Sequence, residues 1–145
     1  MSNVEAFLTQ TEEAEIIEAI RVAEQHTSGE IRVHLEAKSK GDAFDRAAEV
    51  FDFLHMHNTK HSNGVLIYVA IEDRTLVILG DKGINNKVPP TFWESTKDII
   101  IDHFKNGNTK QGLVDGILNA GQQLKMHFPY KKGDTNELSD DISIG

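Results

Sequence analysis

The chain has 145 residues, the size of one ordinary domain, and no cysteine, which excludes disulfide frameworks, thiol catalysis and thiolate zinc sites. Its formal net charge of -8 at pH 7 disfavours a nucleic-acid partner, because such binding relies on lysine and arginine replacing counterions. The chain has neither a run of about 18 apolar residues nor a basic-then-apolar export signal, so we expect no membrane segment and a cytoplasmic location.

The first predicted helix spans residues 12–26 and is followed by a strand. Thr9 or Thr11 can cap this helix, and Glu12 stands three residues after Thr9, which is the spacing of a capping box. Apolar residues then recur at helical intervals until a Thr-Ser-Gly turn ends the pattern. Residues 30–36 alternate between polar and apolar side chains, which predicts a strand with one buried face.

A second helix and two more strands complete the predicted sheet. Residues 44–54 carry apolar side chains at helical spacing, and residues 63–71 contain a continuous apolar run that is typical of a strand buried on both faces. The strand, helix and strand together make a βαβ unit, whose strands are parallel and whose crossover is right-handed. Residues 74–79 are close enough to form an antiparallel hairpin with the second strand, so the predicted sheet is mixed.

Two helices follow the predicted sheet. A pair of prolines ends the loop after the third strand, and a helix with an apolar face begins near Thr91, a possible cap. The last helix begins near Thr109. It contains Gly112 and Gly116 at four-residue spacing, which indicates that a neighbouring backbone packs closely against this helix.

The composition changes near the C-terminal end of the chain. From residue 131 onward it is dominated by Gly, Asp, Asn, Ser and Glu, and the apolar residues are too few to build a second core. We therefore predict one α/β domain over residues 1–130 and a disordered acidic tail over residues 131–145.

The predicted topology brings polar residues from three segments to one end of the sheet. The first two strands start there and the third ends there, so Glu30, Asn63 and Asp81 are expected to converge. Two carboxylates and an amide carbonyl are ligands that Ca²⁺ or Mg²⁺ prefers, with water completing the shell. Asp115 becomes a third carboxylate if the last helix packs over this end. Glu94 is a further candidate, because it lies in the first turn of its helix near the Asp81 loop.

Ordinary structural roles are the alternative for these residues. Asp81 lies between two glycines, where aspartate commonly stabilises a tight turn, and Glu30 is then simply an exposed strand position. Glu94 shares a helix face with Asp98 and Asp102, which is the pattern of a solvated acidic surface.

Histidines offer a second, weaker metal hypothesis. His55, His57 and His61 are near one another in sequence, and imidazole nitrogens bind zinc or nickel. No carboxylate spacing completes a recognised signature, and a solvated loop is the simpler interpretation. His34 lies on the polar face of the first strand, where a solvated or hydrogen-bonded ring is expected.

Five short motifs occur in the order of a known family. They are Ser28-Gly29-Glu30-Ile31-Arg32, Asn63-Gly64-Val65-Leu66-Ile67-Tyr68, Gly80-Asp81-Lys82-Gly83-Ile84, Phe92-Trp93-Glu94 and Gly112-Leu113-Val114-Asp115-Gly116-Ile117. Over residues 10–128 the chain resembles the TPM domain family. The resemblance implies a three-layer α/β/α sandwich with a small mixed sheet and an acidic divalent-metal site at one sheet end. Glu30 and Asp81 match family positions, and Asp115 matches less firmly.

Three functions are compatible with the residues and with this resemblance. The first is a module that binds Ca²⁺ or Mg²⁺ at Glu30 and Asp81 and regulates or scaffolds an unidentified protein partner. The second is a metal-dependent phosphomonoester hydrolase, an activity implied by the resemblance to plant members, with Lys82 or Arg32 offsetting the phosphate charge. The third is a structural interaction domain that binds no metal.

Overall fold

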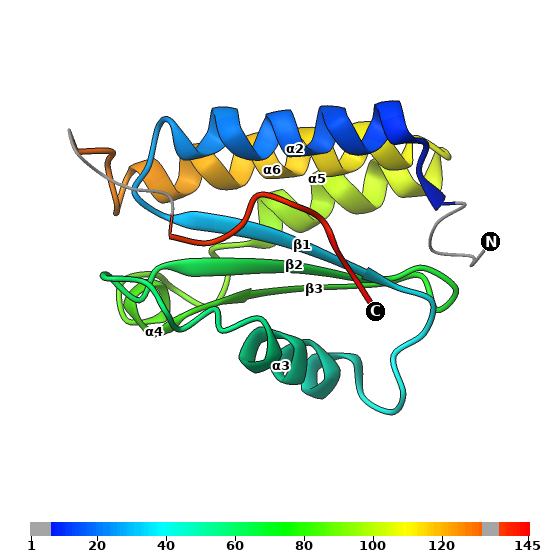
Figure 1. Cartoon of the computed structure of the whole chain (residues 1–145), viewed down its shortest axis with the longest axis horizontal. Coiled ribbons are helices and arrows are strands. Elements are labelled where there is room, and N and C mark those ends of the chain that lie inside the picture. Colours follow the sequence, from blue (N-terminus) through cyan, green and yellow to red (C-terminus); the bar gives the residue numbers. More distant parts are fainter. Residues whose placement is uncertain (1–6, 132–136) are drawn as a thin grey trace.

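The computed structural model describes residues 7–131 and 137–145, and Figure 1 shows a sheet between two helical layers. In chain order the elements are α2 (Gln10–Glu24), β1 (Glu30–Glu36), α3 (Ala43–Phe53), β2 (Gly64–Ala70), β3 (Thr75–Gly80), α4 (Lys82–Asn85), α5 (Glu94–Lys105), α6 (Thr109–Lys125) and β4 (Ser143–Ile144). Each predicted helix and strand has a counterpart. The short helix α4 occupies a segment that the sequence predicted to be a loop, and β4 lies in the predicted tail.

The strands form one mixed sheet in the order β3-β2-β1-β4. β1 and β2 are parallel, with Glu30 opposite Gly64, whereas β2 and β3 are antiparallel, with Val65 opposite Gly80. The predicted βαβ unit and the predicted hairpin are therefore both confirmed. β4 adds a short parallel strand to the other edge of β1.

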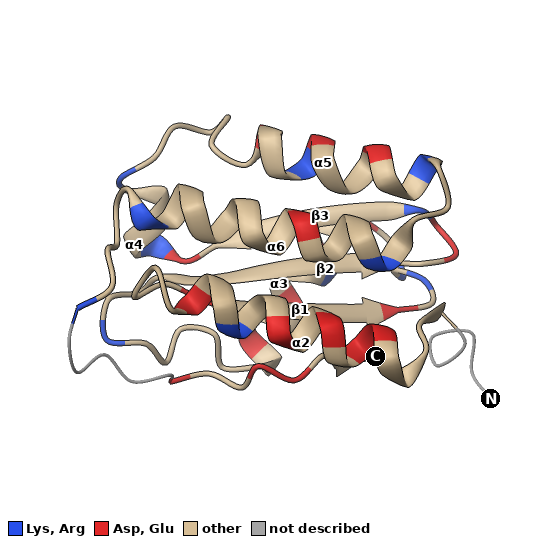
Figure 2. Ribbon diagram, turned by 90° about the horizontal axis from the view of Figure 1, so that it is seen from above, with Lys and Arg blue, Asp and Glu red and all other residues tan. Residues whose placement is uncertain are grey.

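Helices α2, α6 and α5 lie side by side over one face of the sheet, and α3 covers the other face (Figures 1 and 2). β2 is buried on both faces, as its apolar run predicts: alternate residues enter the larger core under the three helices (Val65, Ile67, Val69) and the smaller core under α3 (Leu66, Tyr68, Ala70). The α/β sandwich with a mixed sheet is confirmed. No helix within residues 7–131 or 137–145 is long and apolar enough to cross a bilayer.

The starts of two helices test the predicted caps. Thr9 caps α2 in a reciprocal box: its Oγ1 accepts from the Glu12 backbone N–H at 3.1 Å, and Glu12 Oε1 accepts from the Thr9 N–H at 3.0 Å. The prediction of a Thr91 side-chain cap was wrong, because α5 begins after Trp93 without a side-chain cap. Thr91 instead accepts the Glu94 N–H through its backbone carbonyl, at 3.1 Å.

Glycines in α6 allow it to pack as the central helix of its layer. A Cβ at Gly116 would lie 2.4 Å from Ile100 Cγ1 of α5, and a Cβ at Gly112 would lie 2.9 Å from His103 Cβ of the same helix. On the other side, a Cβ at Gly121 would lie 2.7 Å from Ala23 Cβ of α2. The close backbone approach predicted from the glycine spacing is confirmed.

The structure places residues 137–145 along β1, where the sequence predicted a disordered tail (Figure 1, red). Leu138 is buried in the smaller core, Arg32 donates to the Asp141 carbonyl at 3.3 Å, and the Gly145 N–H donates to the Leu35 carbonyl at 2.9 Å. Main-chain groups of this segment form hydrogen bonds with β1, which composition alone does not reveal. Residues 132–136 of the predicted tail lie outside the described residues.

Candidate functional site

Glu30, Asn63 and Asp81 lie at the same end of the sheet, as the topology predicted. The Glu30 backbone N–H donates to the Asn63 carbonyl at 3.2 Å. Asp81 directly follows β3, and its N–H donates to the Gly64 carbonyl at 2.9 Å. Because Gly64 is the register partner of Glu30, the three segments form one row across β1, β2 and the end of β3.

Within that row, Glu30 and Asp81 stand on either side of Gly64, on the face covered by α3. Adjacent strands are about 4.8 Å apart, so the Cα atoms of the two acids are separated by roughly 10 Å. Gly64 has no side chain to fill the space between them: a Cβ there would lie 2.9 Å from the Met56 carbonyl oxygen. The carbonyl oxygen of Met56 therefore lies over Gly64, between the two acids.

Glu30 is buried, with 3% of its surface exposed, and the C-terminal segment covers it. Its Oε1 accepts from the backbone N–H groups of Glu137 and Leu138, the latter at 3.0 Å. Its Oε2 is buried and has no hydrogen-bond partner among the described residues. Burial raises the pKa of Glu30 to about 7, although the two backbone hydrogen bonds oppose this effect.

Glu24, at the end of α2, brings a second carboxylate close to Glu30. It accepts the Ile31 backbone N–H at 3.1 Å. Burial, a hydrogen bond with Asp140 and the nearby charge of Glu30 together raise the pKa of Glu24 to about 10. Acidic groups from α2, β1 and the C-terminal segment thus meet at this end of the sheet.

Asp81 is also buried, and His57 is its side-chain partner. Asp81 Oδ1 accepts from the Lys82 backbone N–H at 2.8 Å and lies 3.0 Å from His57 Nδ1, whereas Oδ2 is buried without a partner among the described residues. His57 Nε2 lies 2.9 Å from Asp52 Oδ1. Hydrogen bonds with Asp52 and with Asp81 raise the pKa of His57. This histidine therefore orients Asp81, a role that the sequence did not reveal.

Asn63 ties together the loops that carry the row. It is 1% exposed, and its side-chain Nδ2 donates to Ser28 Oγ at 3.4 Å. Its backbone N–H donates to Thr59 Oγ1 at 3.1 Å. The loop before β2 is thereby fixed to the turn before β1.

Asp115 and Glu94 are not brought to this row. Asp115 is on α6, on the opposite face of the sheet, where its carboxylate bonds to His103 Nε2 at 3.0 Å and to Gln111 Nε2 at 2.7 Å. The packing of α6 that would bring Asp115 to the row does not occur, because its glycines turn toward α5 and α2. Glu94 is an exposed residue at the start of α5, on that same helical layer.

The described residues contain no ready-made cluster of metal ligands. Within residues 7–131 and 137–145, no three histidine, cysteine, aspartate or glutamate side chains are grouped so that they could hold an ion. A cation at the row therefore needs main-chain oxygens or water beside the two carboxylates, which is common for Ca²⁺ and Mg²⁺.

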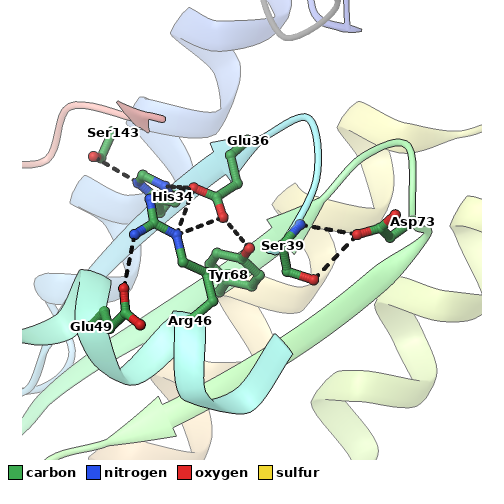
Figure 3. Close-up of polar contacts among 8 residues, drawn as sticks. All are labelled: His34, Glu36, Ser39, Arg46, Glu49, Tyr68, Asp73 and Ser143. Carbon is green, nitrogen blue, oxygen red and sulfur yellow. Dashed lines mark hydrogen bonds and ion pairs between the residues drawn. The ribbon is translucent and has the colours of Figure 1, made fainter. Parts of the chain in front are cut away.

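A second polar cluster lies on the α3 face, toward the end of β1 that is opposite Glu30 (Figure 3). At its centre is the buried Glu36, which accepts from Arg46 Nε and Nη2, both at 2.9 Å, and from the Tyr68 hydroxyl. His34 Nε2 lies 3.0 Å from Glu36 Oε1, and His34 Nδ1 lies 2.9 Å from Ser143 Oγ. Burial alone would raise the pKa of Glu36, but these hydrogen bonds from Arg46, Tyr68 and His34 lower it to about 2.

The chain Ser143, His34, Glu36 has the order of a hydrolytic triad, yet its electrostatics favour a structural role. In a triad, the carboxylate stabilises the imidazolium that forms during reaction. Here Arg46 already neutralises Glu36, and burial lowers the pKa of His34. The cluster joins β1, β2, α3 and β4 and fixes the C-terminal strand to the sheet.

Comparison with known proteins gives the family. A family model described as the TPM domain matches residues 2–123, most of the chain. The chain belongs to the TPM domain family. It is similar over its whole length to the BA42 protein of the psychrophilic bacterium Bizionia argentinensis, solved by NMR: the identity is 59%, each chain is covered to 100%, and the TM-score is 0.93.

Two more distant NMR structures share the TPM domain's fold. The N-terminal domain of a P. gingivalis protein is 21% identical. The match covers 86% of this chain and 82% of that domain, with a TM-score of 0.70. The N-terminal domain of cg2496 from Corynebacterium glutamicum is 11% identical, with 88% and 78% coverage and a TM-score of 0.64. No curated protein matches the chain.

The sequence predicted that Glu30, Asn63 and Asp81 of this TPM domain meet at one end of the sheet. It did not predict the roles of the neighbouring side chains. Glu24 was assigned only to the first helix, because nothing local shows that the end of α2 meets the start of β1. His57 was interpreted as a loop residue, and Glu36 as one more polar position of an alternating strand. The one signal for Glu36 was its place beside His34 on the same strand face.

Proposed function

We propose that this TPM domain is a binding module for a divalent cation, Ca²⁺ or Mg²⁺, held at the Glu30 and Asp81 end of the sheet. The observation that carries the proposal is the pair of buried carboxylate oxygens, Glu30 Oε2 and Asp81 Oδ2, which have no partner among the described residues. Buried polar atoms are nearly always hydrogen-bonded, so two orphaned oxygens in one row need an explanation. A hard cation is a partner that suits both.

The surroundings of Glu30 support the same proposal. Two further acids, Glu24 and Asp140, lie near Glu30. The pKa of Glu24 is raised to about 10 and the pKa of Glu30 to about 7. Crowded carboxylates keep protons when no cation is present, and an ion that binds them displaces those protons. Because Glu30 also holds residues 137 and 138, an ion here acts on the C-terminal segment, the surface through which we propose the module engages its protein partner.

A metal titration followed by NMR tests this proposal. Ca²⁺ and Mg²⁺ are added separately to the metal-free chain while backbone amide shifts are recorded. We expect the largest changes around Glu30, in residues 81–83 and in residues 137–141, and their loss in Glu30→Gln and in Asp81→Asn. Asp98→Asn, an exposed acid on α5, is the matched control and keeps the response.

Two outcomes oppose the proposal. If the amide shifts are scattered over the surface, or do not occur around Glu30 and Asp81, the proposed cation site is wrong. A melting temperature that does not change in millimolar Ca²⁺ or Mg²⁺ favours the metal-free interaction domain, because an ion that binds only the native state raises its stability.

A specific cavity favours phosphomonoester hydrolysis as the second candidate function. It has a volume of about 180 Å³ and opens at the same end of the sheet. Ser28, His61, Lys87 and His127 are among the residues that line it, and they supply hydrogen-bond donors and positive charge. A phosphate group there would lie beside the segments that carry Glu30, Asn63 and Asp81. A cation in the row would polarise the phosphoryl group.

Turnover of p-nitrophenyl phosphate in the presence of Mg²⁺ tests the hydrolase. We expect activity that falls in Lys87→Gln and in Asp81→Asn but persists in Lys97→Gln, a charge-matched change on α5 away from the cavity. Equal background turnover in the wild type and in Asp81→Asn would remove this candidate and leave cation binding unaffected.

A further inference from the structure

A hollow of about 680 Å³ lies at the opposite end of the sheet from the Glu30 and Asp81 row. It is bounded by the β2–β3 hairpin, by the last turn of α5 and by the start of α6. Its volume falls within the roughly 300–1,000 Å³ of small-molecule sites. The hollow shares no residue with the candidate cation site, so this inference does not rest on the proposed function.

Most of the wall is apolar and comes from segments far apart in the chain. Its apolar members are Phe7, Val69, Ile71, Leu76, Ile101 and Phe104. The rings of Phe7 and Phe104 meet edge to face, with centroids 6.4 Å apart. Ile101 is 40% exposed, although it lies beside these rings. Covering such a surface with an apolar chain is favourable, at about 25 cal/mol per Å² of apolar area removed from water.

The charge at this hollow is opposite to that of the molecule. Arg74 and Lys105 line it, and no described aspartate or glutamate does. The chain as a whole has a formal net charge of -8 at pH 7. Neither cation forms a salt bridge with a described carboxylate, so both can pair with a ligand.

An apolar wall with two such cations fits an amphiphile that carries a negative head. We propose that the hollow binds a linear apolar chain with a carboxylate head, of the fatty-acid type. The chain lies against Ile101, Phe104 and the hairpin. The head pairs with Arg74, whose guanidinium presents parallel N–H donors that match a carboxylate, and with Lys105.

Binding of decanoate to the full chain, below its micellar concentration, tests the proposal by calorimetry and amide shifts. We expect shifts confined to residues 69–76 and 101–109. Hexanoate should bind at least about tenfold more weakly, because each buried methylene contributes to affinity. Decyltrimethylammonium, which has the same chain and the opposite charge, should bind more weakly than decanoate by a similar factor.

Substitutions at the two cations complete the test. Arg74→Gln and Lys105→Gln should each weaken decanoate binding by about threefold, the size expected for an exposed ion pair. Lys97→Gln, the same charge change on α5 outside the hollow, should leave binding unchanged. Equal affinity for decyltrimethylammonium, equal effects of the three substitutions, shifts elsewhere or no binding would each overturn the proposal. If the three substitutions have equal effects and the hollow binds an apolar peptide more tightly than decanoate, its ligand is a peptide segment instead.

Discussion

At Glu36, a single buried carboxylate depends on several hydrogen-bond partners. Its side chain is 5% exposed, and Arg46, Tyr68 and His34 all contact it. Removing its charge leaves the Arg46 guanidinium without its main partner and weakens the bonds to the other two. We expect Glu36→Gln to lower the free energy of unfolding by about 2 kcal/mol, measured by urea denaturation.

The control for this prediction is the other carboxylate that contacts Arg46. Glu49 lies 3.3 Å from Arg46 Nη1, but its side chain is 70% exposed. Glu49→Gln should therefore change stability by less than about 0.5 kcal/mol. Equal losses from the two substitutions would show that burial does not decide the strength of this network.

Glu30 predicts an unusual pH dependence for the metal-free chain. Burial raises its pKa from an ordinary 4.5 to about 7, so between these pH values the folded chain binds a proton that the unfolded chain has lost. Stability from this group is present below pH 4.5 and is lost as the pH rises through 7. We expect the melting temperature of the metal-free chain to fall over this range.

Two comparisons isolate the contribution of Glu30. In Glu30→Gln the fall should be smaller, whereas in Glu94→Gln, an exposed position on α5, it should persist. Saturating Ca²⁺ should reduce the fall, because the ion binds the deprotonated carboxylate. A melting temperature that rises between pH 4.5 and 7 without metal would contradict this role of Glu30.

At the scale of elements, the contact between α5 and α6 depends on a missing side chain. A Cβ at Gly116 would lie 2.4 Å from Ile100 Cγ1, and Ile100 is fully buried. Alanine would raise the helix propensity of α6, but the helices must then move apart. We expect Gly116→Ala to lower the free energy of unfolding by about 2 kcal/mol in urea denaturation.

The matched control is Gln122→Ala, which adds an alanine to the same helix at an exposed position. It should be neutral or slightly stabilising, by about a few tenths of a kcal/mol at most. If Gly116→Ala behaves like this control, the close approach of α5 and α6 does not limit stability.

β4, like the short helix α4, is an element that sequence reasoning did not anticipate. Its segment is short and polar, and its position is set by side chains of β1: Glu30 accepts two backbone N–H groups, Arg32 donates to a carbonyl, and His34 meets Ser143. The alternating polar residues of β1 were predicted to lie on the exposed face of a strand with one buried face, where His34 was expected to be solvated or hydrogen-bonded. They are instead the partners of a strand more than a hundred residues away.

For the whole molecule, local patterns were enough to predict the layout of the sheet. The alternation in residues 30–36, the apolar run before Ile71 and the nearby hairpin partner determine which strands are parallel and which ends coincide. Glu30, Asn63 and Asp81 could be placed together for that reason. Asp115 could not, because its position depends on how α6 rotates against α5 and α2, and glycine spacing shows closeness without showing direction.

The central claim is that Glu30 and Asp81 hold one cation across Gly64. Calorimetric titration of Ca²⁺ into the metal-free chain, into Glu30→Gln and into Asp81→Asn tests it most directly. If both carboxylates bind one ion, either substitution alone should abolish Ca²⁺ binding at this site, because each removes one of its ligands. Wild-type stoichiometry and affinity in either variant would contradict the claim.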